Sequence, residues 1–510
     1  MKNFKFIYIT IGILAFTACN DPEDVDIAPE VMVEESVELT AGSADFSNYV
    51  SIGNSLTAGF TDGALFQAGQ ELSLPNLLSQ KFSLVGGGSF TQPLTNDNLG
   101  GLAAGGARIQ DPRLVFGGAG PVGLETLIGP VTVTTDIALN NPTGPFNNLG
   151  VPGAKSFHLL APGYGNLDNV SLGRANPYFV RMTGSTPNAS VLELAVAQAP
   201  SFFSLWGGEN DVLGYATSGG DGTNPITPVS GAPGVGFDGS YGALIATLTA
   251  GGAQGVVANI PNVLNIPHFT TVPHNPVPLD AATAAAVNGA YIPYNGGLQA
   301  AFGALAGTGL FTQEELDART ISFVEGANNA VVIEDETLTD LGAINPAFAA
   351  LPKIRQATAD DLLVLPAASF IGTLAVEGNP LTVNGVAIPL ADKWVLLPSE
   401  QEEITAATEA FNQIIAATAS QAGLAFVDAN SLLNQLANGG ITSGQFTLTS
   451  SLVTGSAFSL DGIHPTARGY ALLANEFMKA IDVTYGSNFE ASGNLLNVGN
   501  YPTNYPVILQ

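Results

Sequence analysis

Positive charge is scarce in this sequence. Lysine and arginine together number 14 against 43 aspartates and glutamates, which gives a formal net charge of −29 at pH 7. An electrostatic field of that sign repels the phosphates of nucleic acid and the surface of anionic lipids. We therefore predict that the folded domain has no nucleic-acid partner and does not bind a membrane surface directly. The charge otherwise keeps the protein soluble.

Cysteine and histidine are also scarce. The only cysteine is Cys19, so the folded domain has no disulfide and no thiolate metal site. Of the four histidines, His268 and His274 lie six positions apart and match no common metal-binding spacing. The first predicted strand is not followed by the glycine pattern that nucleotide-binding folds require. We expect neither a metal ion nor a nucleotide cofactor.

The N-terminal apolar stretch, residues 6–18, is too short to span a bilayer. Lys2 and Lys5 precede it, and it ends in Phe16-Thr17-Ala18-Cys19. This order resembles the signal peptide and lipobox of a bacterial lipoprotein, which implies cleavage after residue 18 and lipidation of Cys19. The alternatives are a plain secretory signal or a short anchor with a chance cysteine. The acyl chains of a lipoprotein would tether the chain to a membrane and leave the domain itself soluble.

The next segment, residues 19–45, is strongly acidic. From Asn20 to Asp45 it carries nine acidic residues, no basic residue, two prolines and no aromatic residue. Like charges repel, and the segment has too little apolar surface to form a core, so we predict a disordered stalk. An acidic patch directly after the cysteine also resembles the surface-export signal of lipoproteins in the Bacteroidetes. The resemblance implies a lipid-anchored protein of the cell envelope, at the outer membrane and exposed on the surface.

From Phe46 the chain alternates short apolar strands with helices. A strand ends at Gly53, and further strands are expected at 145–151, 201–206, 255–260 and 424–428. Helical patterns occupy 72–82, 189–199, 238–250, 398–422 and 466–481. Five such strands separated by helices indicate an α/β fold with a parallel sheet covered on both faces.

Two stretches, at about 85–144 and 268–395, do not follow this alternation of strands and helices. Both are rich in loops, and we interpret them as large insertions in a single domain spanning 46–510. The second contains helix-like pieces at 280–290 and 295–306.

Polar or glycine-rich turns follow three of the predicted strands, where ligands bind in a parallel sheet. Ser55 follows the first strand, Gly153 the second and Asn210 the third, and a loop before the last helix supplies Asp461 and His464. Taken singly, each would be a helix cap, a turn residue or a buried histidine. Their joint occurrence favours catalysis, because a serine hydroxyl becomes a nucleophile only beside a base.

Four segments resemble the sequence blocks of the SGNH hydrolases, also called GDSL esterases/lipases. They read Gly-Asn-Ser-Leu at 53–56, Asn-Leu-Gly-Val-Pro-Gly at 148–153, Gly-Glu-Asn-Asp at 208–211 and Asp-Gly-Ile-His-Pro at 461–465. The resemblance covers the strand and loop framework from about residue 48 to 486 but not the two insertions. It implies a three-layer α/β/α, flavodoxin-like fold and hydrolysis of carboxylic esters through an acyl-serine intermediate.

The resemblance also implies a role for each residue. Ser55 would be the nucleophile, His464 the general base, and Asp461 the carboxylate that orients the imidazole. The oxyanion hole would consist of the backbone N–H groups of Ser55 and Gly153 and the side-chain amide of Asn210. No metal or cofactor takes part.

The chain departs from the family at Asn54, where the family has an acidic residue before the serine. Because this side chain is outside the triad, we expect loop geometry to absorb the change. Apolar segments in the insertions, at 84–90, 300–311 and 364–374, favour lipid or other acyl esters as substrates. The alternatives are a carbohydrate O-deacetylase of the same fold, or a surface lipoprotein that binds a glycan or lipid without turnover.

Overall fold

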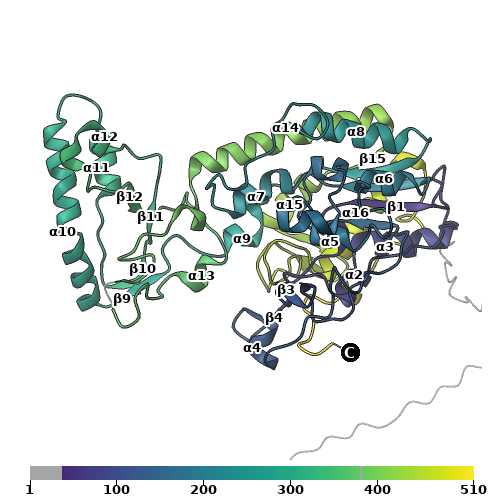
Figure 1. The fold of residues 1–510 in the computed structure, drawn as a ribbon, viewed down its shortest axis with the longest axis horizontal. Coiled ribbons are helices and arrows are strands. Elements are labelled where there is room, and N and C mark those ends of the chain that lie inside the picture. Colours follow the sequence, from purple (N-terminus) through teal and green to yellow (C-terminus); the bar gives the residue numbers. More distant parts are fainter. Residues whose placement is uncertain (1–36, 380–381, 510) are drawn as a thin grey trace, which may run out of the picture. The chain divides into compact units, whose positions relative to one another are not determined.

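The computed structural model describes residues 37–379 and 382–509. The chain divides into two units, 1–38 and 39–510, and everything below concerns the second (Figure 1). The predicted signal peptide, Cys19 and most of the predicted stalk lie outside the described residues. Among the helices of the described residues, none is long and apolar enough to cross a membrane.

The second unit begins at Leu39, earlier than the predicted boundary at Phe46. The backbone N–H of Thr40 donates to Asn488 Oδ1 at 2.7 Å, and that of Ser43 donates to the Tyr485 carbonyl at 2.7 Å. The prediction that the disordered stalk extends to residue 45 was therefore wrong. Its acidic residues are concentrated before residue 39, and the uncharged stretch after them packs on the domain.

Five parallel strands form the central sheet, as predicted from their alternation with helices. They are β1 (Tyr49–Gly53), β6 (Asn148–Gly150), β7 (Phe202–Trp206), β8 (Gln254–Ala258) and β15 (Ala425–Val427). The spatial order is β15-β8-β7-β1-β6, so the first strand lies between the second and the third. In doubly wound sheets of this order, ligands bind at the carboxyl ends of the strands where the order reverses. Here that point lies between β1 and β7.

Helices flank the sheet on both faces, which is compatible with the predicted three-layer fold. On one face lie α6 (Val191–Val196), α8 (Phe237–Thr249) and α14 (Pro398–Ala422), the last two visible along one side of the sheet in Figure 1. On the other face lie α3 (Leu74–Phe82) and α16 (Ala467–Tyr485). Alternate residues of β7 face this second layer: the Phe202 ring lies 5.7 Å from Phe82, and the Trp206 ring lies 5.8 Å from Phe477.

Most sequence-predicted helices agree with the structure to within a few residues, and α14 agrees at both ends. Pro398 suits its first turn, where no backbone N–H is needed. Glu400 accepts the backbone N–H of Leu397 at 2.7 Å, and Gly423 ends the helix with a φ of +66°. Short elements around the sheet are α1 (Ser55–Ala58), α2 (Gln67–Glu71), α5 (Pro177–Val180), α7 (Asn210–Thr217), α9 (Pro267–Thr270), α15 (Ala429–Ala437), β16 (Ile441–Ser443) and β17 (Phe446–Leu448).

The two regions predicted as insertions lie outside the central sheet. The first contains β2 (Leu102–Ala104), β3 (Ala107–Gln110), β4 (Leu114–Phe116), β5 (Pro121–Gly123) and α4 (Leu124–Ile128). The second contains β9 (Val277–Leu279), α10 (Ala281–Ala304), α11 (Gln313–Arg319), β10 (Gly326–Asn329), β11 (Val332–Glu334), α12 (Leu341–Ile344), β12 (Ile354–Gln356), β13 (Leu362–Leu363), α13 (Ala367–Phe370) and β14 (Val395–Leu396).

Helix α10 corrects the expectation of two separate helical pieces. It runs continuously through Pro293, with Tyr291 and Leu298 buried on either side of the proline. Proline weakens a helix interior, but burial of apolar side chains on both sides offsets that cost.

Candidate active site

The turn that carries Ser55 is shaped by close backbone packing. Strand β1 ends at Gly53, and a Cβ there would lie 2.1 Å from the Trp206 carbonyl oxygen. A Cβ on Gly150 of β6 would lie 2.3 Å from the backbone nitrogen of Ala58 in α1. Only glycine permits these approaches. The short helix α1 is thereby held against the ends of both neighbouring strands.

Asn54 begins α1 and places Ser55 at its first position. The Asn54 Oδ1 accepts the backbone N–H of Leu56 at 2.9 Å, which is a helix N-cap. Ser55 therefore stands at the carboxyl end of β1, where the order of the strands reverses, with 7% of its surface exposed.

The side chains of Ser55, His464 and Asp461 form a continuous hydrogen-bonded array. The Ser55 Oγ lies 2.9 Å from His464 Nε2, and His464 Nδ1 lies 2.8 Å from Asp461 Oδ2. The His464 side chain is 11% exposed. In this arrangement one ring nitrogen can accept the hydroxyl proton while the other donates to the carboxylate. The structure thus brings Ser55 together with Asp461 and His464, which were predicted on one loop far from it in the sequence.

The carboxylate of Asp461 is held by more donors than His464 alone. Its Oδ1 accepts from the backbone N–H groups of Ile463 (2.9 Å) and His464 (2.8 Å) and from the Ser459 hydroxyl (3.1 Å), and its Oδ2 accepts from the Gly63 N–H (2.9 Å). Burial alone would raise the pKa of Asp461, but the His464 charge and these hydrogen bonds hold it well below its usual range. Asp461 is therefore ionised at neutral pH and fixes the orientation of the imidazole.

Sequence reasoning missed the turn at Asp62 and Gly63, which is hydrogen-bonded to the loop that carries Asp461 and His464. Asp62 has a φ of +51°, its Oδ1 accepts the Leu460 N–H at 3.0 Å, and its own N–H donates to the Ser459 hydroxyl at 3.0 Å. Burial raises the pKa of Asp62 to about 7. An Asp-Gly pair is a turn signal, and it was the one available pointer to this element.

The two other predicted oxyanion donors lie at the same edge of the sheet. Gly153 follows β6 with a φ of +79°, a conformation that favours glycine. Asn210 opens α7, and its Nδ2 donates to the Ala154 carbonyl at 3.0 Å, which leaves its second amide hydrogen available. Gly153 and Asn210 line one pocket together with Ser55 and His464.

This pocket has a volume of about 360 Å³ and is lined by both apolar and polar side chains. The Phe60 ring lies 4.6 Å from the His464 ring and 6.1 Å from that of Tyr178. The apolar lining residues are Phe60, Pro152, Tyr178, Leu213 and Ile463, and the polar ones include Gln110, Lys155, Thr217 and Asn224. Gln110 belongs to the first insertion, whereas none of the described lining residues comes from the second. Two of these wall residues, Pro152 and Ile463, lie within the segments singled out in the sequence, but neither was predicted to line the pocket.

His268 lies beside the candidate site without joining it. Its backbone N–H donates to the Gly462 carbonyl at 2.9 Å, and its buried ring nitrogens have no hydrogen-bond partner among the described residues. Burial lowers the pKa of His268 to about 4, so the ring is neutral. It contacts the loop that carries Asp461 and His464 but not Ser55.

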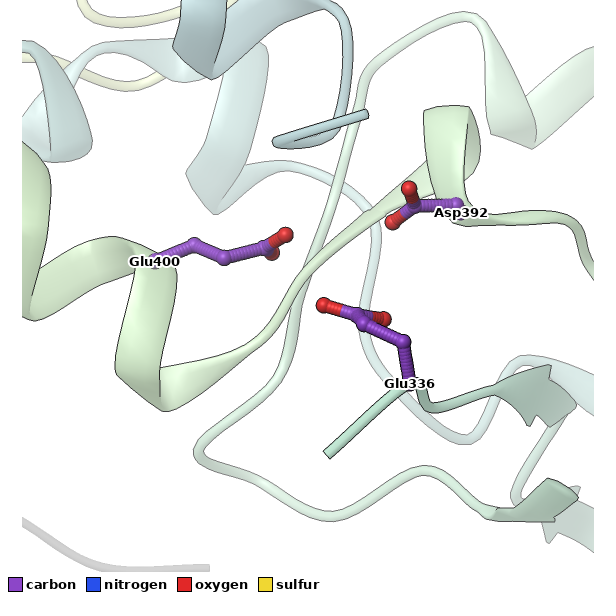
Figure 2. Close-up of side chains that lie close together, drawn as sticks. All are labelled: Glu336, Asp392 and Glu400. Atoms are coloured by element: carbon purple, nitrogen blue, oxygen red, sulfur yellow. The ribbon is translucent and has the colours of Figure 1, made fainter. Parts of the chain in front are cut away.

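Three carboxylates gather elsewhere, at the start of α14. Oxygens of Glu336, Asp392 and Glu400 lie within 4.8 Å of one another, and the side chains converge in Figure 2. Burial raises the pKa of Asp392 to about 6 and that of Glu400 to about 8, with further contributions from acidic neighbours. Glu400 already serves as the cap of α14. Asp392 Oδ1 has no hydrogen-bond partner among the described residues, but Asp392 is only partly buried, and we assign no metal site.

The chain matches no family model, no curated protein sequence and no solved structure. A functional assignment therefore depends on the residues of the site and their geometry.

Proposed function

We propose that the protein is a serine esterase/lipase of the SGNH (GDSL) type, which hydrolyses carboxylic esters through an acyl-serine intermediate without a cofactor. The observation that carries the proposal is the array Ser55–His464–Asp461, with hydrogen bonds of 2.9 and 2.8 Å, at the point where the strand order reverses. A binding module needs no such array, whereas a serine nucleophile requires a base and an orienting group.

In the proposed mechanism, His464 Nε2 takes the proton of Ser55 as Oγ attacks the ester carbonyl carbon. The tetrahedral intermediate collapses when the protonated His464 gives its proton to the leaving alcohol, which leaves Ser55 acylated. A water molecule then loses a proton to His464 and attacks the acyl carbon. The acid departs, and Ser55 regains its proton from His464. Asp461 remains ionised throughout and stabilises the imidazolium.

The oxyanion of each tetrahedral state would be bound by the backbone N–H groups of Ser55 and Gly153 and by the Asn210 amide. The contact of Asn210 with the Ala154 carbonyl supports this role, because it fixes the amide before the substrate arrives. A donor held in place costs no reorganisation during the reaction, and each is worth about 2.7–4 kcal/mol in the transition state.

The walls of the pocket support two substrate classes. The apolar lining residues, among them Phe60, Tyr178 and Ile463, suit the acyl chain of a lipid or another acyl ester. The polar lining residues favour a second candidate, a carbohydrate O-deacetylase, since Gln110 and Asn224 could donate to and accept from sugar hydroxyls. We favour acyl esters because one apolar lining residue, Phe60, packs with its ring 4.6 Å from that of His464 and so lies next to the reacting atoms.

The N-terminal sequence supports a location for this activity. The apolar stretch before Cys19 and the acidic segment after it are the basis for proposing a lipid-anchored enzyme of the cell envelope, at the outer membrane. The lipid is the proposed membrane contact, and the substrate a small-molecule or lipid ester.

A panel of p-nitrophenyl esters from acetate to laurate tests the proposed function and the substrate class together. We expect kcat/KM to rise by about fourfold for each methylene that is buried against the apolar lining residues, since burying one CH₂ contributes about 0.8 kcal/mol. Activity confined to acetyl groups on polysaccharides would support the deacetylase instead. No activity on any ester would leave a non-catalytic binding lipoprotein as the remaining function.

A further inference from the structure

Glu209 is a buried carboxyl that the proposed mechanism does not use. It lies between β7 and α7 with 3% of its surface exposed. Its Oε2 accepts a hydrogen bond from Asn54 Nδ2, and its Oε1 has no hydrogen-bond partner among the described residues. None of the ion pairs found between described residues involves it. A carboxylate buried without a cation is costly, so its surroundings favour the neutral acid.

Asn54 links Glu209 to the turn that carries Ser55, the proposed nucleophile. Its side chain is 1% exposed and has one donor end and one acceptor end. Glu209 accepts from the donor end, so the acceptor end faces the backbone N–H of Leu56 and caps α1. Glu209 thereby sets the orientation of the amide that holds Ser55 in place.

The next two residues of α7 make equivalent contacts with the turn after β6. Asn210 donates to the Ala154 carbonyl at 3.0 Å. Asp211 accepts from the backbone N–H of Ser156 at 2.8 Å and from its hydroxyl at 2.7 Å. The start of α7 is therefore tied on one side to the Ser55 turn and on the other to the turn of Gly153.

We propose that Glu209 is a positioning residue, which remains uncharged and holds the Ser55 turn and the start of α7 in fixed register through Asn54. The inference depends on the proposed esterase function. As a neutral acid, Glu209 accepts the Asn54 N–H without needing a cation. As a carboxylate it would place a negative charge one residue from Asn210, and so oppose the oxyanion that forms there.

The groups that face Glu209 also favour its neutral form. They are the Asp211 carboxyl on its own helix, the buried Tyr241 hydroxyl on α8, which has no hydrogen-bond partner among the described residues, and the uncharged Asn54 amide. Burial, and to a smaller extent Asp211, raises the pKa of Glu209, hydrogen bonds from its own backbone and from Asn54 partly offset the rise, and the resulting pKa is about 8. The carboxyl is neutral at pH 7 and ionises as the pH rises through about 8.

The test compares Glu209→Gln, Glu209→Ala and the control Glu402→Gln, which changes an exposed acid on α14. The kcat for p-nitrophenyl butyrate is measured from about pH 6 to about pH 10, after subtraction of the Ser55→Ala rate. We expect kcat of the wild type and Glu402→Gln to fall about tenfold from its maximum by about pH 10 as Glu209 ionises. Glu209→Gln should lack this alkaline fall, because glutamine keeps the acceptor oxygen and does not titrate.

At pH 7 we expect Glu209→Gln to lower kcat by less than about threefold and Glu209→Ala by about tenfold or more, with KM little changed in both. Superimposable pH profiles for the wild type and Glu209→Gln would overturn the proposal. So would a loss in Glu209→Gln as large as in Glu209→Ala, since both outcomes exclude a neutral acceptor as the functional form.

A second readout does not require turnover. Between about pH 5 and pH 8 the folded wild type keeps the Glu209 proton that the unfolded chain has lost. The Tm of the wild type should therefore fall relative to that of Glu209→Gln as the pH rises through this range. A constant difference in Tm would overturn the uncharged state. If the protein shows the expected Tm shift but no Ser55-dependent turnover, the proposed esterase function is refuted, and with it the positioning role of Glu209. The uncharged state of Glu209 would still stand.

Discussion

Replacement of Ser55 by alanine is expected to abolish ester hydrolysis, lowering kcat by about 10⁶-fold. The reason is that the hydroxyl 2.9 Å from His464 Nε2 is the only group proposed to form the acyl intermediate. The measurement is the initial rate with p-nitrophenyl butyrate at pH 8. A circular dichroism spectrum and the Tm establish that the variant is folded.

The matched control for this variant is Ser83→Ala, which removes an exposed hydroxyl at the end of α3 and should leave the rate unchanged. His464→Ala should cost about as much as Ser55→Ala, and the double variant no more than either, because the two residues act as a unit. Rates in Ser55→Ala equal to those of the wild type would refute the mechanism.

The Asp461→Asn variant is expected to lower kcat by about 10⁴-fold with little change in KM. Asparagine can present an N–H to the imidazole, which then adopts the wrong tautomer and cannot accept the Ser55 proton. The backbone N–H groups of Ile463 and His464 both donate to Oδ1, so they favour the amide oxygen at that position and leave the NH₂ group facing the ring. The measurement is kcat across a range of pH, with the exposed Asp360→Asn as the control.

The same substitution has an expected effect on stability. The pKa of Asp461 is lowered in the folded state, so its ionised form stabilises the fold above the unfolded-state pKa. That contribution is lost as the pH falls below about 4. The Tm difference between the wild type and Asp461→Asn should therefore shrink in acid. In the activity measurement, a kcat of Asp461→Asn within tenfold of that of the wild type would contradict the orienting role of Asp461.

The sheet was predictable because its information is local. Each of the five strands is a short apolar run bounded by turn residues, and the rule that ligands bind at the carboxyl ends of parallel strands placed Ser55 and Asn210 at one edge. Helix α14 was predicted with both of its ends because proline, acidic residues and glycine mark them in the sequence.

Contacts between segments distant in the sequence were beyond reach. The sequence gives no sign that Glu209 accepts from Asn54, that the Gly63 N–H donates to Asp461, or that Gln110 of the first insertion lines the pocket. Each depends on tertiary packing that brings together residues far apart in the chain. The departure at Asn54 is the clearest case. From the sequence we expected loop geometry to absorb this change, whereas in the structure Asn54 is buried and donates a hydrogen bond to Glu209.

The most direct measurement is the mass of the peptide containing Ser55 after the protein has reacted with a fluorophosphonate. This reagent transfers its phosphonyl group to an activated serine and releases fluoride. The proposed mechanism predicts one phosphonyl group per chain, located on Ser55, absent in His464→Ala and suppressed by excess ester substrate. A protein that hydrolyses esters while Ser55 remains unmodified, or that is labelled at another residue with loss of activity, would contradict it.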